Sequence, residues 1–429
     1  MLEKRIPIPV VEAVARVMEY AHRGETEKVS LIESYGRILG EDVVADHDVP
    51  HFDRSPYDGF AIRAEDTKEA SSSNPIQFEV IGEIGAGFVF TKEVKAFQAV
   101  RIMTGAAIPA GCNAVVMLEL TEGFEENEKT YMKLKRIFAA SDNISFKGED
   151  VKQNAILVKK GTSINPGVVA LLATFGYSSV NVIRQPVIGI VTTGSELLKV
   201  HEQLKQGKIR NSNSYMIAAQ VERAGGIVRY YGQFVDDLET CYNTVKKAMK
   251  EVDILITTGG VSVGDYDYLP AIYERLQANV LFNKIAMRPG SVTTVAEVEG
   301  KLLFGLSGNP SACYVGCELY VRPVIQTYLH RKDPHVYRAE AILQKDFPKA
   351  NPFTRFVRGK VEIVNGKLQV IPVGLDKSSA ISSLADTNAF IVLPGGTRGF
   401  ESGITVSVLL LESNVGSKWP WKEPLRSYK

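Results

Sequence analysis

One stretch limits the possible folds more than any other, an apolar run that leads into two adjacent glycines. Val252–Ile256 has the composition of a buried strand, Gly259 and Gly260 follow, and the next segment has the pattern of a helix. Adjacent glycines let the chain turn with positive φ and leave amide N–H groups exposed, so such a unit can hold an oxyanion. The same turn carries the acids Asp265 and Asp267, which suit an anion site only if a cation lies between them. A solvated turn therefore stays open as an alternative.

Three more apolar runs end in small or acidic residues, namely Pro186–Val191, Ile227–Val235 and Leu302–Leu306. Helix-like segments follow three of the four runs, and this alternation is typical of a doubly wound α/β domain. In an open parallel sheet, ligands bind at the carboxyl ends of the strands. The four runs therefore predict a ligand site at one edge of the sheet.

The rest of the chain reads as β-rich segments and one interrupted domain. Short apolar runs separated by glycines and charges predict a β-rich insertion, and the Asn365-Gly366 hairpin signal lies among the short strands of a small C-terminal β-barrel. The fold class is therefore multidomain, α/β plus β. The predicted boundaries are 1–45 and 146–178 for the N-terminal domain, 46–145 for the insertion, 179–330 for the α/β domain, 335–413 for the barrel and 414–429 for a tail.

Composition excludes several classes of function. The formal net charge is +1 over 429 residues, so no bulk attraction favours nucleic acid or an anionic membrane. No apolar run approaches the roughly 20 residues of a membrane span, and the N-terminus lacks the apolar core of a signal peptide. The four cysteines form no Cys-x-x-Cys pair and read as buried thiols of a reducing compartment. We therefore expect a cytoplasmic protein with small-molecule ligands, without a P-loop or a Ser-His-Asp motif.

Taken together, the motifs resemble those of one family, the molybdopterin molybdenumtransferases, whose eukaryotic relatives include the C-terminal part of gephyrin. The resemblance runs in order through nearly the whole chain and rests on residues 55–60, 103–106, 148–150, 192–196, 257–267 and 307–311. The chain departs from the family pattern at Tyr57, Ser291, Val292 and Ser307. The resemblance implies an elongated N-terminal domain and a homodimer whose cleft draws residues from both chains.

The resemblance also implies the last assembly step of the molybdenum cofactor. Adenylylated molybdopterin is bound, its adenylate bond is hydrolysed, molybdate is placed on the dithiolene sulfurs, and AMP leaves. The catalytic residues implied are Asp58, Thr104, Asp150, Glu196, Asp236 and Asp267. The binding residues expected are Thr193, Gly194, Gly259, Gly260, Ser262, Gly264, Lys284, Arg288, Pro289, Gly308, Asn309, Pro310, Arg358 and Ser378.

Three of these acids also predict a metal site. Glu196, Asp236 and Asp267 follow three different strand-like runs, so a parallel sheet would bring them to one edge. Carboxylates facing molybdate and a pyrophosphate would oppose binding unless a cation lay between them. Ligands that are all oxygen favour Mg²⁺ over softer metals.

Two other functions stay open. One is the preceding adenylylation of molybdopterin, although that activity is expected from an α/β domain alone, without the β-rich domains. The other is a non-catalytic scaffold of the gephyrin type, although the chain has no long linker between two such modules. The expected partners are the small-molecule substrates, a second copy of the chain and the molybdopterin adenylyltransferase.

Overall fold

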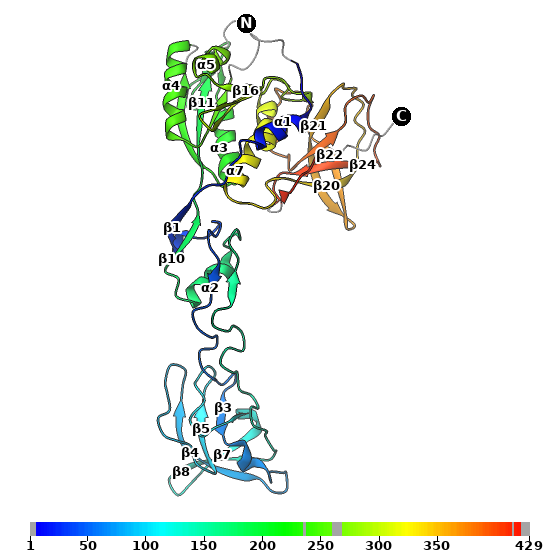
Figure 1. The fold of residues 1–429 in the computed structure, drawn as a ribbon. Helices are drawn as coiled ribbons and strands as arrows, with labels where there is room; N and C mark the ends of the chain where they lie inside the picture. The colour runs from blue at the N-terminus through cyan, green and yellow to red at the C-terminus, as the bar shows by residue number, and fades with distance from the viewer. Residues whose placement is uncertain (1–5, 235–236, 260–267, 414–415, 422–429) are drawn as a thin grey trace. The chain divides into compact units, whose positions relative to one another are not determined.

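The structure is a computed structural model that describes residues 6–234, 237–259, 268–413 and 416–421 (Figure 1). The chain folds into two compact units. The first unit comprises Met1–Lys28 and Asn181–Lys429, and the second unit comprises Val29–Val180. The second unit is therefore an insertion into the first along the chain.

The first unit is built on a six-stranded sheet in which four neighbouring strands are parallel and two further strands on one side join through antiparallel pairing. Thr193 pairs with Phe234, Thr192 pairs with Thr258, and Thr258 pairs with Leu306, so the four parallel strands end level with one another. The predicted convergence of these strand ends is confirmed. In spatial order the strands are β14 (Ile227–Phe234), β11 (Val187–Thr193), β15 (Ile254–Thr258), β19 (Lys301–Leu306), β18 (Thr294–Val298) and β16 (Asn279–Phe282).

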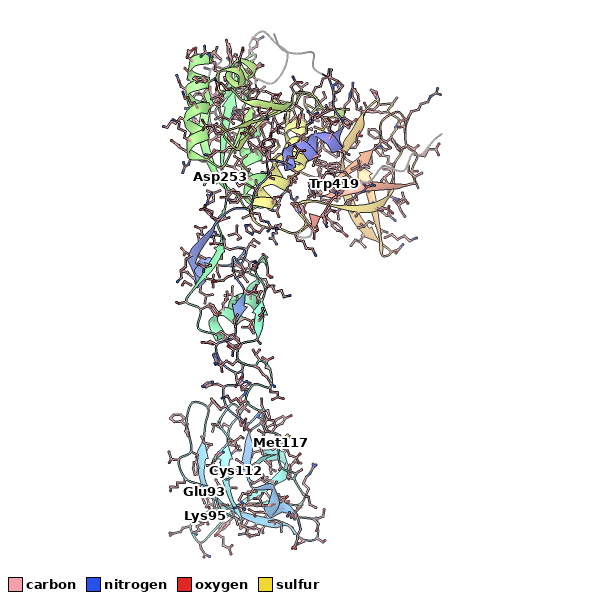
Figure 2. All side chains as sticks on the ribbon, viewed as in Figure 1. Glu93, Lys95, Cys112, Met117, Asp253 and Trp419 are labelled. Atoms are coloured by element: carbon pink, nitrogen blue, oxygen red, sulfur yellow. The ribbon has the colours of Figure 1, made fainter. Side chains whose placement is uncertain are left out.

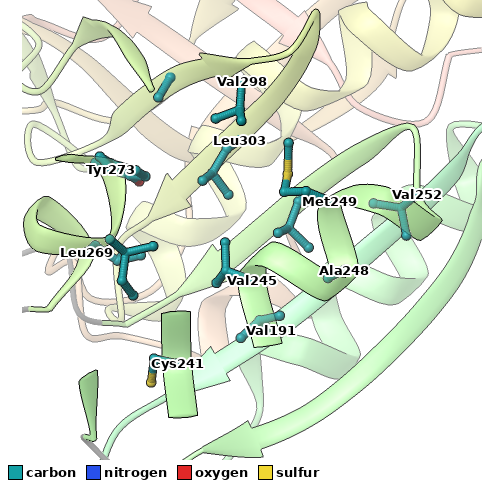
Figure 3. Packing of buried hydrophobic residues seen from close by; sticks show 13 residues of the cluster. Val191, Cys241, Val245, Ala248, Met249, Val252, Leu269, Tyr273, Val298 and Leu303 are labelled. Carbon is teal, nitrogen blue, oxygen red and sulfur yellow. The ribbon is translucent and has the colours of Figure 1, made fainter. Parts of the chain in front are cut away.

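Helices cover both faces of this sheet. Helix α4 (Leu238–Glu251) packs with α5 (Leu269–Arg275), whereas α3 (Asn213–Arg223) packs with α6 (Pro310–Gly316). Figure 3 shows the apolar core under α4 and α5, where Val245 and Met249 meet Leu303 of the sheet. The predicted doubly wound α/β fold is therefore confirmed.

Two helical segments join the α/β core to the start of the chain. Helix α6 continues through a π-helical turn at Cys317–Val321 into α7 (Arg322–Tyr328). Helix α1 (Val10–Met18) buries its apolar face against β16 and α7. Its Arg16 Nη1 donates to the carbonyl of Leu281 in β16 at 2.6 Å.

The C-terminal part of the first unit is a closed five-stranded β-barrel, as predicted. The order β21-β22-β20-β24-β23 closes because β21 also pairs with β23. Asn365 and Gly366 both have positive φ in the turn between β21 and β22, which is the hairpin geometry expected for this dipeptide. The strands are β20 (His335–Leu343), β21 (Thr354–Val364), β22 (Lys367–Pro372), β23 (Ala389–Leu393) and β24 (Thr405–Leu410), with β17 (Met287–Arg288) beside β21 and β25 (Gly416–Ser417) beside β20.

The second unit is dominated by a six-stranded sheet around a core that contains Phe78 and Met132. Its strands, in order, are β6 (Ala114–Met117), β3 (Gly59–Ile62), β5 (Gln98–Ile102), β4 (Ile76–Ile84), β8 (Lys129–Leu134) and β7 (Thr121–Glu126). The unit is β-rich, as predicted, but the finer boundaries at 45, 146 and 178 stay predictions. The remaining elements are α2 (Pro166–Thr174), the pair β2 (Val43–Val44) and β9 (Ile156–Val158), the pair β1 (Thr26–Ser30) and β10 (Ser179–Ile183), and, in the first unit, the pair β12 (Leu197–Leu198) and β13 (Ile209–Arg210).

Two global expectations can be compared with these elements. Within the part of the chain that is described, no helix combines the length and apolar character needed to cross a bilayer. All four cysteines are free, three of them buried, which agrees with their reading as thiols rather than disulfides.

Candidate functional site

The carboxyl edge of the α/β sheet brings together three predicted binding residues, Thr193, Gly259 and Gly308. Gly259 has a φ of +86°, and a Cβ on it would lie 2.3 Å from the carbonyl oxygen of Thr193. Because no side chain fits this space, the turn requires glycine. A Cβ on Gly308 would lie 3.8 Å from the Cα of Gly259, so the two glycine turns are neighbours.

The first residues of α3 tie these turns together. Asn213 Nδ2 donates to the carbonyl of Gly308 at 2.9 Å and to Thr258 Oγ1 at 3.2 Å. Asn211 makes a different contact: its Oδ1 accepts a hydrogen bond from the backbone N–H of Ser214 in the first turn of α3, at 3.2 Å. Helix capping is therefore done by Asn211, while Asn213 connects two strand ends.

The predicted metal ligands can be placed only in part. Glu196 is exposed shortly after β11, and a Cβ on Gly194 would touch its carboxylate oxygens. The strands that precede the three acids, β14, β11 and β15, are adjacent. Within the described residues no group of three His, Cys, Asp or Glu side chains is arranged to hold a metal. The predicted residues Asp236, Gly260, Ser262, Gly264 and Asp267 lie outside the described residues.

A second feature of the first unit is a cavity of about 520 Å³ between the α/β core and the barrel. It brings together five predicted residues, Arg288, Pro289, Asn309, Arg358 and Ser378. The charged side chains in its lining are four cations and one carboxylate, so the cavity is suited to an anion. The lining residues that the sequence did not single out for binding are Gly290, Ser291, Val292, Ser307, Ala312, Arg355, Asp376, Lys377 and Ser379.

Arg358 is the buried cation of this cavity, with only 2% of its surface exposed. Its Nη2 donates to the carbonyl of Leu375, and its Nε has no hydrogen-bond partner in the part of the chain that the structure describes. Burial lowers the pKa of Arg358, and the nearby Asp376 carboxylate opposes that effect. Because a guanidinium stays charged at neutral pH, a bound anion would supply the partner that this side chain lacks.

The loop that carries Ser378 is held from both sides. Asp376 Oδ2 accepts from Arg355 Nη1 at 2.6 Å on the barrel side. On the α/β side, the backbone N–H of Ser311 donates to the carbonyl of Ser378 at 3.0 Å, and Ser311 Oγ donates to the carbonyl of Ala380 at 2.6 Å. These contacts fix the loop as one wall of the cavity.

Two predicted binding residues, Lys284 and Pro310, belong neither to the lining of the cavity nor to the glycine turns. The carbonyl of Lys284 accepts from the backbone N–H of Ile8 at 3.1 Å, and Pro310 is the first residue of α6. Sequence reasoning passed over Arg355 and Lys377. The available signal was their position beside the two predicted residues Arg358 and Ser378.

In the second unit, Asp58 and Thr104 form one constellation. Asp58 Oδ1 accepts from the backbone N–H of Thr104 at 2.7 Å and from its hydroxyl at 2.9 Å. These two bonds lower the pKa of Asp58, so it is an exposed carboxylate at neutral pH. Asp150 is exposed in the segment that bridges Val49 and Val151, where its backbone N–H donates to the carbonyl of Val49 at 3.0 Å.

Comparison with protein families covers most of the chain. Residues 8–176 match the MoeA N-terminal region (domain I and II). Residues 189–327 match a probable molybdopterin binding domain, and residues 340–411 match the MoeA C-terminal region (domain IV).

Individual relatives agree with these matches. The chain is 63% identical over 429 residues to the molybdopterin molybdenumtransferase of Bacillus subtilis (strain 168), covering 100% of both chains. It is 52% identical over 413 residues to the protein of that name from Staphylococcus epidermidis, covering 96% of this chain and 98% of that one. The solved molybdopterin biosynthesis moeA protein of Pyrococcus horikoshii OT3 is 33% identical, covers 94% of this chain and 100% of its own, and has a TM-score of 0.77. The resemblance in the motifs is confirmed, and the chain belongs to the molybdopterin molybdenumtransferase (MoeA) family.

Proposed function

We propose that this protein inserts molybdate into molybdopterin during the biosynthesis of the molybdenum cofactor. Its full-length identity to the molybdopterin molybdenumtransferases and its match to a molybdopterin binding domain support the proposal. The function so assigned is that of a transferase, and its two small-molecule substrates are molybdopterin and molybdate.

The observation that carries the proposal is Arg358, a buried cation in a cavity whose charged lining is suited to an anion. Molybdate is a dianion, so it gains from a cavity lined by Arg288, Arg355, Arg358 and Lys377. The guanidinium of Arg358 is already desolvated by burial, and its Nε is unpartnered among the described residues. A desolvated charged donor binds an oxyanion more strongly than a solvent-exposed one. Molybdate would therefore lie between the α/β core and the barrel.

The detailed substrate in this proposal is adenylylated molybdopterin, which loses AMP by hydrolysis. The turns at Gly194 and Gly308 support it, because glycine turns at the ends of parallel strands can leave backbone N–H groups free for phosphate. Gly259 instead shapes the edge between them, since its N–H donates to the carbonyl of Leu306 at 3.3 Å. Lys284 would add positive charge near this edge. In this arrangement the adenylate lies at the sheet edge and molybdate in the cavity.

Mg²⁺ is part of the same proposal and rests on the sequence. Glu196, Asp236 and Asp267 would hold it at the sheet edge, where its charge would neutralise the phosphates. Carboxylates at the ends of adjacent strands are the oxygen ligands that Mg²⁺ takes.

We also propose a homodimer in which Asp58, Thr104 and Asp150 complete the site. The exposed Asp58 carboxylate, held by two hydrogen bonds from Thr104, supports a role for it outside its own unit. Mixing an Asp58→Ala protein with an Arg358→Met protein should restore part of the activity, because one intact site would form. A monomer with full activity would contradict this. Cytoplasmic location and contact with the adenylyltransferase belong to the same proposal.

The experiment that tests the function measures AMP release and the molybdenum-loaded pterin formed from adenylylated molybdopterin and molybdate. Arg358→Met should weaken molybdate binding at least about tenfold, because it removes a charged hydrogen-bond donor. Lys360→Met is the matched control, since Lys360 lies on the same strand but is exposed and pairs with Glu362. Equal molybdate affinity in the two variants would refute the assignment of the cavity.

The same assay separates the two alternatives. Formation of adenylylated molybdopterin from ATP would favour the adenylyltransferase function. Absence of both activities in a folded wild-type protein would favour a scaffold.

A further inference from the structure

Three buried polar atoms at the carboxyl edge of the sheet have no hydrogen-bond partner among the residues that are described. They are Thr193 Oγ1, Asn213 Oδ1 and Ser214 Oγ. Their residues are 7%, 8% and 3% exposed. Because native proteins leave few buried polar groups unpaired, three in one place point to a ligand.

The three atoms flank one glycine turn. The Cβ position of Gly259 lies 3.3 Å from Thr193 Oγ1. Asn213 bonds to Oγ1 of Thr258, which directly precedes Gly259, and Ser214 follows Asn213 in α3. A ligand over this turn would therefore lie beside Thr193 and Asn213, and Ser214 is the next residue of the same helix.

The orientation of Asn213 fixes which kind of group it can bind. The carbonyl oxygen of Gly308 can only accept a hydrogen bond, so the Asn213 amide must direct Nδ2 toward it. The free Oδ1 then lies on the other side of the same planar amide and needs a donor. Molybdate and the phosphates of the adenylate carry no proton to donate at neutral pH. Divalent cations prefer carboxylates, which none of these three side chains supplies.

We propose that Thr193, Asn213 and Ser214 bind the fused aminopyrimidine ring of the substrate, and that Asn213 Oδ1 accepts from a ring N–H or amino group. This inference rests on the proposed function, which supplies a substrate with such a ring. Pterin carries these donors, and so does the adenine of the adenylate. The hydroxyls of Thr193 and Ser214 can donate or accept, so they suit the remaining polar atoms of either ring.

The test replaces the two hydroxyl side chains, because Asn213 also holds Gly308 and its loss would disturb the fold. Thr193→Val and Ser214→Ala remove hydroxyls that have no partner among the described residues, so neither should lower the melting temperature. Each should weaken the binding of neopterin or of AMP about three- to tenfold in calorimetric titrations. The control is Thr257→Val, because Thr257 is fully buried and its hydroxyl donates to the carbonyl of Phe304 at 3.3 Å. It should lower the melting temperature and leave both affinities unchanged.

The two probes identify the ring. Weaker neopterin binding assigns these side chains to the pterin, weaker AMP binding assigns them to adenine, and either result supports the site. Unchanged affinity for both probes in both variants would overturn the inference, as would a wild-type protein that inserts molybdate but binds neither probe. Wild-type protein that inserts no molybdate refutes the proposed function instead.

Discussion

His335 should make the stability of the first unit fall in mildly acidic solution. It begins β20, is 4% exposed, and its ring makes an edge contact with Trp419 at 5.4 Å between centroids. Trp419 is labelled in Figure 2. Within the described ranges, Nδ1 of His335 has no hydrogen-bond partner. Burial lowers the pKa of His335 from 6.5 to about 4, so the ring is neutral in the folded protein at physiological pH.

The size and sign of the effect follow from this pKa shift. One pKa unit corresponds to about 1.4 kcal/mol, so the shift holds about 3 kcal/mol of folding free energy. The folded pKa is the lower one, so the unfolded chain binds the proton first as the pH falls. The contribution is therefore fully present above pH 6.5 and is lost as the pH falls from 6.5 to about 4.

His335→Gln is the matched comparison, because glutamine is polar and does not titrate. Urea unfolding, followed through the fluorescence of Trp419 and Trp421, should show the free energy of unfolding of the wild type falling by about 3 kcal/mol more than that of the variant between pH 6.5 and 4. The two tryptophans are the only ones in the chain, so the signal comes from this segment. Nuclear magnetic resonance of labelled histidine should place the His335 titration near pH 4. A titration near 6.5, or equal pH dependence in the two proteins, would refute the reasoning.

Three further outcomes are expected. Glu318→Gln should lower the free energy of unfolding by about 3 kcal/mol in urea titrations, because this 1%-exposed carboxylate pairs with two arginines; a change below 1 kcal/mol would contradict that. Gly59→Ala should prevent stable folding of the second unit, since its Cβ would lie 1.9 Å from the carbonyl oxygen of Val116. The control Gly123→Ala should fold, because the nearest atom to its Cβ would be 4.0 Å away, and circular dichroism of both proteins tests this difference in folding. Asp267→Asn should fold normally and lose AMP release that depends on Mg²⁺, and full wild-type activity in excess chelator would remove the metal from the mechanism.

The sheet edge could be predicted because its signals are local. Each strand is an apolar run followed by small residues, and parallel pairing brings such ends level without any knowledge of distant contacts. Gly259 is an example. The sequence shows it as a glycine that follows a strand-like run, and the structure shows that the carbonyl of Thr193 leaves no room for a Cβ there.

The cavity could be predicted only in part because it depends on contacts between distant residues. Arg355 faces Asp376 only after the barrel closes between β21 and β23, and Ser378 reaches Ser311 only after the barrel meets the α/β core. Lys284 and Arg288 are close in the sequence, yet only Arg288 lines the cavity. Arg288 belongs to the short strand β17, which pairs with β21 of the barrel, and this pairing is again a contact between distant residues.

The position of the second unit along the chain affects synthesis on the ribosome. Helix α1 is translated first, but its partners β16 and α7 follow roughly 300 residues later. At about 5–20 residues per second, the face formed by Val10, Val14 and Val17 waits roughly 15 to 60 seconds for the surface that buries it. The second unit has left the ribosome in the meantime and can fold first. The apolar face of α1 is therefore left uncovered on the nascent chain throughout most of its synthesis, and a chaperone that binds it would protect the first unit until its last elements emerge.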